Sequence, residues 1–353
     1  MKRIADAIAT RALAAALAAA ACATAFADGH EAAKCRYVRV GTAPLEWRGS
    51  QPFVQGSVKG LPLSMELDTA GLGNRISPAL AEKLELVQTA AMWSDDGDGT
   101  SSTQDYIGHL PEFDIGTARW LRTTALVTHT ADRSGMFVGP NALFDFDFEM
   151  NDKAIVFFRP ENCARDASLA YWSPGAPFAG LEQGDDKDRR VYVKAELNHH
   201  SATALVSSAD AATLVNLEFA RGLGIDPVAL GLPSRTAWVG GHKRTMWIGR
   251  FDEFALDEEV VRNAHVAIVD LHGAVRAANF VEERGRFRAP DLILGGDFLK
   301  AHRVLFATSQ RRMYFTYLGG EIFNTPTTAD GADPESPGSA SAPAPAASAA
   351  PAR

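Results

Sequence analysis

The chain has 353 residues, enough for about two domains, and its 46% hydrophobic and 22% charged residues are typical of a globular protein. Its net charge of −8, without a basic stripe, argues against nucleic-acid binding. No strongly apolar run of about 18 residues follows the N-terminus, so we expect no membrane span in the mature chain. Three cysteines are too few for a disulfide-rich scaffold or a four-cysteine zinc site.

Residues 1–27 read as an export signal. Arg11 closes a positively charged start, residues 12–21 are apolar and Ala-rich, and Ala25-Phe26-Ala27 is a small-x-small cleavage site. A lipoprotein signal ending at Cys22 is the rival interpretation, but it lacks the usual branched aliphatic residue three positions before the cysteine. We therefore expect an exported protein, which would be periplasmic in a Gram-negative bacterium.

Export would leave a pair of cysteines, Cys35 and Cys163, in an oxidising compartment. Closing so long a loop stabilises a fold by about 4–5 kcal/mol in the chain-entropy model. Two buried free thiols are the alternative. We predict a disulfide between Cys35 and Cys163.

Composition marks the limits of the folded part. Residues 329–353 are almost all Ala, Pro, Ser and Gly, which predicts a disordered tail. Residues 164–190 contain SPGAPFAG and EQGDDKDRR, which read as an interdomain linker. The predicted domains are therefore residues 35–163 and residues 191–318.

These two domains carry the same pattern. Residues 53–86 predict two alternating strands, a turn at Asp68 and then a helix that begins at Ser77-Pro78. Residues 191–225 follow the same plan, with the second turn at Ser207. Two further blocks recur downstream, 113–127 with 251–269 and 137–158 with 292–317. Ordered blocks at similar spacing indicate a tandem duplication of a mainly β unit.

The strand that ends in Leu67-Asp68-Thr69-Ala70, followed later by Phe137-Val138-Gly139, resembles the half-site of the retropepsin-like aspartic peptidases. In the second copy Ile293-Leu294-Gly295 fits the later motif. The resemblance implies a mainly β fold in which two tandem acid-protease β-barrel lobes form a pepsin-like pseudo-dimer. It also implies catalytic roles for Asp68 and Thr69 and structural roles for Gly139 and Gly295.

The second half-site departs from the family pattern. Ser207 stands where the second catalytic aspartate is expected, and Ser208 corresponds to Thr69. In this family two close carboxyl groups share one proton, so one activates water while the other polarises the peptide carbonyl. Serine cannot hold that proton. Asp210 is expected in the next helical turn, where it is poorly placed to substitute for the missing aspartate.

A Gly-rich loop follows each half-site where the family has flaps that close over a peptide. If they act as flaps, they hold peptide by strand addition. If not, they are plain solvated hairpin turns. The candidate contacts are Trp93, Gly97, Trp238, Gly240 and Gly241.

Two function classes remain. In the first, the protein is a peptidase relative with an incomplete catalytic dyad, which binds extended peptide or an unfolded protein segment and cleaves it weakly or not at all. In the second, it is an active aspartic endopeptidase in which Asp68 activates water. The sequence implies no cofactor, no metal and no nucleic-acid partner, and we expect a monomer.

Overall fold

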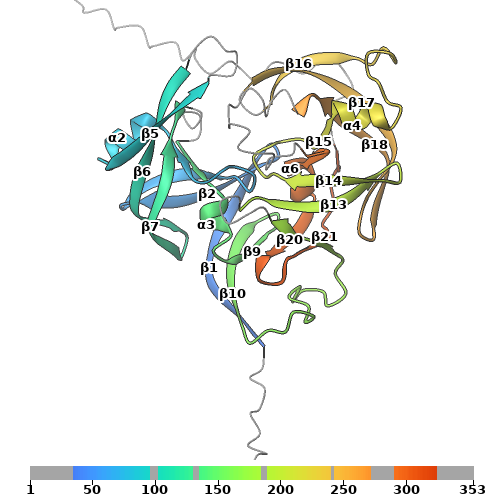
Figure 1. Ribbon diagram of the computed structural model, residues 1–353. Coiled ribbons are helices and arrows are strands. Elements are labelled where there is room, and N and C mark those ends of the chain that lie inside the picture. Colours follow the sequence, from blue (N-terminus) through green and yellow to red (C-terminus); the bar gives the residue numbers. More distant parts are fainter. Residues whose placement is uncertain are drawn as a thin grey trace, which may run out of the picture.

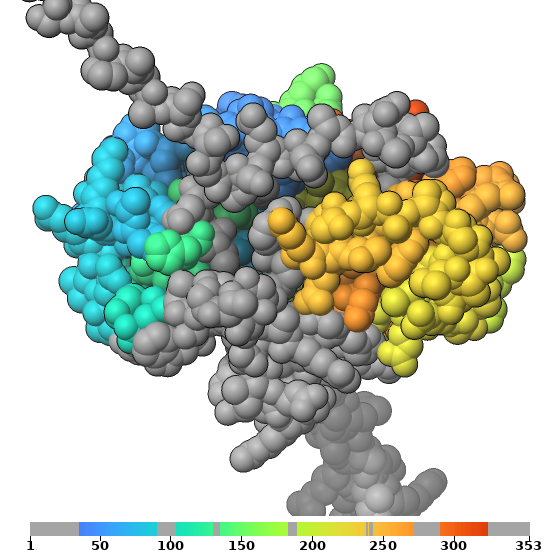
Figure 2. Space-filling model, turned by 90° about the horizontal axis from the view of Figure 1, so that it is seen from above, coloured from blue at the N-terminus to red at the C-terminus, as the bar shows by residue number. Residues whose placement is uncertain are grey.

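The computed structural model describes residues 35–95, 102–129, 135–183, 189–239, 242–271 and 290–323. These residues form a mainly β protein with two lobes (Figure 1). Seen from above, the first lobe, in blue to green, and the second lobe, in yellow to orange, lie on opposite sides of the molecule (Figure 2). The predicted export signal, the predicted tail, and Gly97, Gly240 and Gly241 lie outside the described residues.

The first lobe begins with three antiparallel strands, and the turn at Lys59-Gly60 has a positive φ at both residues, as a tight hairpin requires. The predicted helix begins as expected, because the Ser77 side chain accepts a hydrogen bond from the Leu80 amide. The elements of this lobe are β1 (Arg36–Arg48), β2 (Gln51–Val58), β3 (Leu61–Leu67), β4 (Arg75–Ile76), α2 (Pro78–Lys83), β5 (Gln88–Asp95), β6 (Ser102–Ile115), β7 (Ala118–Val127), β8 (Met136–Val138), α3 (Pro140–Leu143), β9 (Asp147–Met150) and β10 (Ala154–Glu161).

The second lobe begins with another tight hairpin, whose turn at Asn198-His199 also has a positive φ at both residues. The elements from the end of the first lobe onward are β11 (Phe178–Gly180), β12 (Glu182–Gln183), β13 (Val191–Leu197), β14 (His200–Val206), β15 (Leu214–Asn216), α4 (Leu217–Gly222), β16 (Ser234–Val239), β17 (His242–Leu256), β18 (Glu259–Val269), β19 (Leu292–Leu294), α6 (Gly296–Lys300), β20 (His302–Ala307), the 3-10 helix η2 (Thr308–Gln310) and β21 (Arg312–Tyr317).

The two lobes repeat one topology. In the first, β3 pairs in parallel with β8, and the short strand β4 joins β8 to β7. In the second, β14 pairs in parallel with β19, and β15 joins β19 to β18 in the same way. In each lobe, the loop after the second hairpin strand (β3 or β14) therefore lies beside the glycine that follows its parallel partner (β8 or β19).

The lobes share one sheet at their base. Strand β9 of the first lobe pairs with β20 of the second. Among the residues that the structure describes, a 13-stranded sheet therefore runs from β5 to β21 and β11, beside the eight-stranded sheet of the second lobe. Phe148 and Phe306 stack across this junction with ring centroids 4.8 Å apart. The apolar core is continuous between the lobes as a result.

The segment predicted as a linker covers part of this shared sheet. Leu169 and Ala170 are buried against it, and the Tyr171 hydroxyl donates to the Glu149 carboxylate at 2.7 Å. Strand β11 extends the sheet by pairing with β21. Apolar and aromatic residues of this segment therefore dock on the sheet.

The predicted disulfide between Cys35 and Cys163 is present. It joins the residue before β1 to a residue just after β10, and these two strands pair from Arg36 and Glu161 onward. Among the helices of the described residues, none is long and apolar enough to cross a membrane.

Candidate active site

The loops that carry Asp68 and Ser207 are set by equivalent backbone contacts. The Asp68 amide donates to the Val138 carbonyl at 2.9 Å, and the Ser207 amide donates to the Leu294 carbonyl at 2.9 Å. Each of these hydrogen bonds therefore extends the parallel pairing of β3 with β8, or of β14 with β19, into the loop. Both residues are buried.

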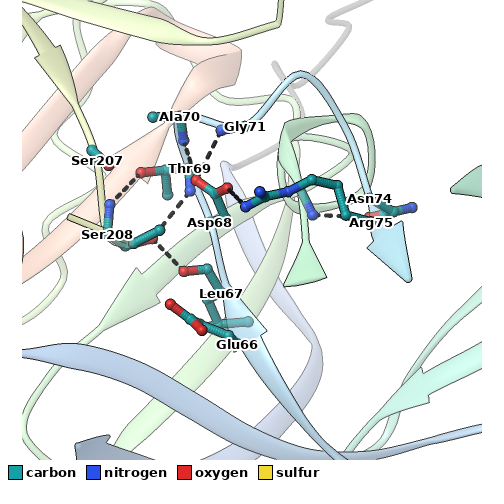
Figure 3. A network of polar contacts seen from close by, with 12 residues as sticks. Glu66, Leu67, Asp68, Thr69, Ala70, Gly71, Asn74, Arg75, Ser207 and Ser208 are labelled. Carbon is teal, nitrogen blue, oxygen red and sulfur yellow. Dashed lines mark hydrogen bonds and ion pairs between the residues drawn. The ribbon is translucent and has the colours of Figure 1, made fainter. Parts of the chain in front are cut away.

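A reciprocal set of hydrogen bonds through Thr69 and Ser208 joins the two loops (Figure 3). The Thr69 amide donates to Ser208 Oγ and the Ser208 amide donates to Thr69 Oγ1, both at 3.0 Å. The Thr69 hydroxyl also donates to the Val206 carbonyl at 2.8 Å, and the Ser208 hydroxyl donates to the Leu67 carbonyl at 2.6 Å. The loops thus meet symmetrically, with Asp68 and Ser207 at matching positions.

Gly139 and Gly295 lie where the backbone of each loop passes closest. A Cβ atom on Gly139 would stand 2.1 Å from the Gly73 backbone, and one on Gly295 would stand 2.4 Å from the Ala212 backbone. Real side chains do not tolerate such distances. Only glycine fits at either position without moving a loop.

The Asp68 carboxylate is held by three N–H donors. Oδ1 accepts from the amides of Ala70 at 3.0 Å and Gly71 at 2.8 Å, and Oδ2 accepts from Arg75 at 2.6 Å (Figure 3). The Arg75 guanidinium also lies over the Phe137 ring, 4.1 Å from its centroid. Asp68 is therefore a paired carboxylate rather than a free one.

Sequence reasoning missed Arg75. The available signal was a cation in the segment Asn74-Arg75-Ile76, directly after the Asp68 loop and before the predicted helix. Its partner could not be read from the spacing, because the loop must fold back before the two side chains meet.

Asp210 is not in a helical turn, contrary to prediction. Residues 208–212 form bends, the strand β15 follows, and helix α4 begins only at Leu217. Strand β15 precedes the helix here just as β4 precedes α2 in the first lobe, so Asp210 lies in the bend region before that strand. The carboxylate of Asp210 thereby reaches the site, where its Oδ2 accepts from Ser207 Oγ at 2.7 Å and its amide donates to the same Oγ at 3.2 Å.

The charges of Asp68 and Arg75 both affect the pKa of Asp210. Burial is the largest cause that raises the pKa of Asp210, and the negative charge of Asp68 raises it further. The Ser207 hydrogen bond and the positive charge of Arg75 lower it, without cancelling the rise. Within the described ranges, no group of three or more His, Cys, Asp or Glu side chains is placed to hold a metal ion.

The predicted flap residues Trp93 and Trp238 fall in β5 and β16, but their side chains lie outside the described part of the chain. Each strand is the outer strand of a hairpin, paired with β6 and β17 respectively. In the described part of the chain, each is also the last strand of its sheet.

Two β lobes that repeat one topology and meet through an aspartate loop and a serine loop define a two-lobed acid-protease fold. Residues 54–141 match the family model described as aspartyl protease, which confirms the resemblance predicted from the sequence. No curated protein matches the chain.

Solved structures similar to this chain have low sequence identity to it. Basic 7S globulin from soybean has 11% identity and a TM-score of 0.43, with 78% of this chain and 94% of that chain covered. The aspartic proteinase from Irpex lacteus has 10% identity and a TM-score of 0.44, with 81% and 99% covered.

Proposed function

We propose that this protein is an aspartic-peptidase relative of the cell envelope that binds extended peptide between its lobes as a monomer and cleaves it weakly or not at all. The observation that carries the proposal is the make-up of the two loops that meet at the site, one with an aspartate and the other with a serine at the matching position. Ser207 has the position in its loop that Asp68 has in the other, next to the Thr69–Ser208 hydrogen bonds, and the Asp68 carboxylate is bound by Arg75 at 2.6 Å.

The chemistry of peptide hydrolysis by two carboxyl groups supports this proposal. Such a pair shares a proton, because two carboxylates at short distance cannot both ionise. At the position opposite Asp68 a hydroxyl cannot take that proton, and Arg75 occupies one oxygen of the carboxylate that remains. Loss of a positioned acid or base lowers the rate of a reaction by about 10²–10⁴.

Strand addition is the mode of binding that the sheets favour. Extended peptides bind to an open sheet edge through main-chain hydrogen bonds. In the described part of the chain, β5 and β16 end their sheets and belong to the hairpins predicted as flaps. Trp93 and Trp238 lie in these two strands, and we propose that they contact the bound peptide.

The alternative is an active aspartic endopeptidase in which Asp68 activates water. The reciprocal hydrogen bonds between Thr69 and Ser208 favour this alternative, because they hold the two loops together as catalysis by groups from both loops requires. The two functions differ in whether bound peptide is cut.

The test measures binding and cleavage of fluorescent unstructured peptides by the purified protein between pH 3 and 7. We expect binding with little or no cleavage in the wild type, and cleavage at mildly acid pH in Ser207→Asp that a statine-type peptide inhibits. The matched control is Asp252→Asn, which changes a side chain that is 86% exposed.

The other outcomes separate the alternatives. Robust wild-type cleavage that is lost in Asp68→Asn would establish the endopeptidase. Robust cleavage that survives Asp68→Asn would show that the site is wrongly assigned. Absence of peptide binding at every pH would contradict the proposed binding function.

A further inference from the structure

The Ser207 hydroxyl has its only hydrogen committed to Asp210. A hydroxyl has one hydrogen to donate and two lone pairs that accept. Ser207 Oγ donates to Asp210 Oδ2 at 2.7 Å and accepts from the Asp210 amide at 3.2 Å. While Asp210 is ionised, Ser207 can therefore accept a hydrogen bond from a ligand but has nothing to donate.

A proton on Asp210 reverses that contact. A protonated carboxyl group is itself an O–H donor. It can donate to Ser207 Oγ, which frees the Ser207 hydrogen to point toward a ligand opposite Asp68. The Asp210 proton therefore decides whether Ser207 donates to the site or only accepts from it.

The surroundings of Asp210 favour the protonated form. The residue is half-buried, burial raises its pKa, and the Asp68 charge adds to the rise. Arg75 is the opposing charge, but its short contact is with Asp68.

The charged groups of the neighbouring helix α6 have other partners. Asp297 accepts from Thr213 at 2.7 Å, and Lys300 donates to the Gly49 carbonyl at 2.7 Å. Helix α6 meets Asp210 through the backbone, where the Gly296 amide donates to the Asp210 carbonyl at 2.7 Å.

We propose that Ser207 and Asp210 together take the place of the missing second carboxyl group, so that protonated Asp210 turns the Ser207 hydroxyl into a donor for a peptide carbonyl opposite the Asp68 carboxylate. This inference rests on the proposed binding of peptide. Asp210 is a positioning residue that acts through Ser207, and it makes peptide binding depend on pH.

The first test is binding of a fluorescent statine-type peptide between pH 4 and 8. Its hydroxyl and carbonyl groups can accept a hydrogen bond from the Ser207 hydroxyl. One neutral hydrogen bond is worth about 1 kcal/mol, so wild-type affinity should fall by about fivefold to tenfold as Asp210 ionises. Asp210→Asn keeps an N–H donor toward Ser207 at every pH. It should bind at all pH values as tightly as the wild type does at pH 4.

Two further variants complete this test. Ser207→Ala should bind weakly throughout, without the pH-dependent step. The control Asp252→Asn should keep the wild-type profile. If the wild type binds the peptide and Asp210→Asn shows the same pH dependence, the role of Asp210 is refuted while the proposed binding function stands. Thermal unfolding of each variant shows that it is folded.

The second test needs no peptide. The carboxyl carbon of Asp210 is followed by NMR as a function of pH in the wild type and in Asp68→Asn. We expect a raised pKa for Asp210 that falls when Asp68 becomes neutral. An ordinary pKa, or one that Asp68→Asn leaves unchanged, would overturn the inference even if no peptide were found to bind.

Discussion

At the scale of single residues, Arg75 gives Asp68 a different environment from that of a proton-sharing acid. The ion pair has one partner almost buried, at 4% side-chain exposure, and the other at 24%. Water screens such a pair less than an exposed one. Asp68 also accepts hydrogen bonds from two backbone amides, so its carboxylate has hydrogen-bond partners without a second carboxyl group.

We predict that Arg75→Leu destabilises the protein by about 3 kcal/mol, since removal of one partner of a buried ion pair leaves the other charge uncompensated. Asp68→Asn in the same background should recover part of this loss, because the orphaned charge is gone. Urea unfolding of the two single variants and the double variant gives the coupling energy. Additive effects would show that the ion pair contributes nothing beyond its separate side chains.

At the scale of elements, Gly139 and Gly295, which directly follow strands β8 and β19, let the backbone of the neighbouring loops pass close by. Gly139→Ala or Gly295→Ala should each lower the free energy of unfolding by about 1–3 kcal/mol or more, because the added methyl group overlaps backbone that cannot rotate away. Each should also weaken peptide binding. The matched control is Gly175→Ala, where a Cβ atom meets nothing within 4 Å. Equal stability of all three variants would contradict the close packing.

The sequence predicts those parts of the site that local hairpin patterns determine. The alternating strands and the Lys59-Gly60 turn place Asp68 at the end of a hairpin, and the same pattern places Ser207. Asp210 was misplaced because the second helix was expected too soon after Ser207. The repeat itself gives the right place, since α2 begins at Pro78, ten residues after Asp68, and α4 begins at Leu217, ten residues after Ser207. Arg75 was missed because its role depends on a fold-back of the chain.

The shared sheet was beyond sequence reasoning for another reason. Strands β9 and β20 are distant in the chain, and neither the alternating sequence DFEM of β9 nor the sequence HRVLFA of β20 carries a mark of its partner. The register that joins Phe148 to Phe306 follows from how two lobes pack, which a repeat of local blocks does not specify.

At the scale of the whole molecule, Asp147 links the lobes and should make stability depend on pH. It lies in β9 and accepts from Ser309 and Thr308 after β20, and from Tyr37 in β1. Burial is the largest cause that raises its pKa, and these hydrogen bonds lower it only in part. Its contribution is therefore most favourable at low pH. It declines as the pH rises from the unfolded pKa, about 4, to the folded one.

We expect the free energy of unfolding to fall less between pH 4 and 7 in Asp147→Asn than in the wild type, because asparagine does not ionise. Urea unfolding at the two pH values measures this difference. Part of the decline should remain, since Asp210 and Asp297 also have raised pKa values. An identical decline in wild type and variant would mean that Asp147 has the same pKa folded and unfolded.

The disulfide is a second link at this scale, and it closes a sequence separation of 128. Replacing Cys35 and Cys163 together by serine should lower the free energy of unfolding by about 4–5 kcal/mol, because the unfolded chain regains the entropy of that loop. Thermal unfolding with and without reductant provides the check, since reductant should move the wild type toward the variant and leave the variant unchanged. A wild type insensitive to reductant at its unfolding midpoint would argue against this contribution.

The pairing of β9 with β20 also has a consequence for how the chain is made. Strand β9 is complete at Met150, and its partner begins only at His302, about 150 residues later. At a synthesis rate of about 5–20 residues per second, this edge stays open for roughly eight to thirty seconds. An open edge is a template for pairing with another chain. Nascent chains arrested before His302 should therefore associate with one another and recruit chaperones, whereas the finished chain has covered that edge with its own last strands.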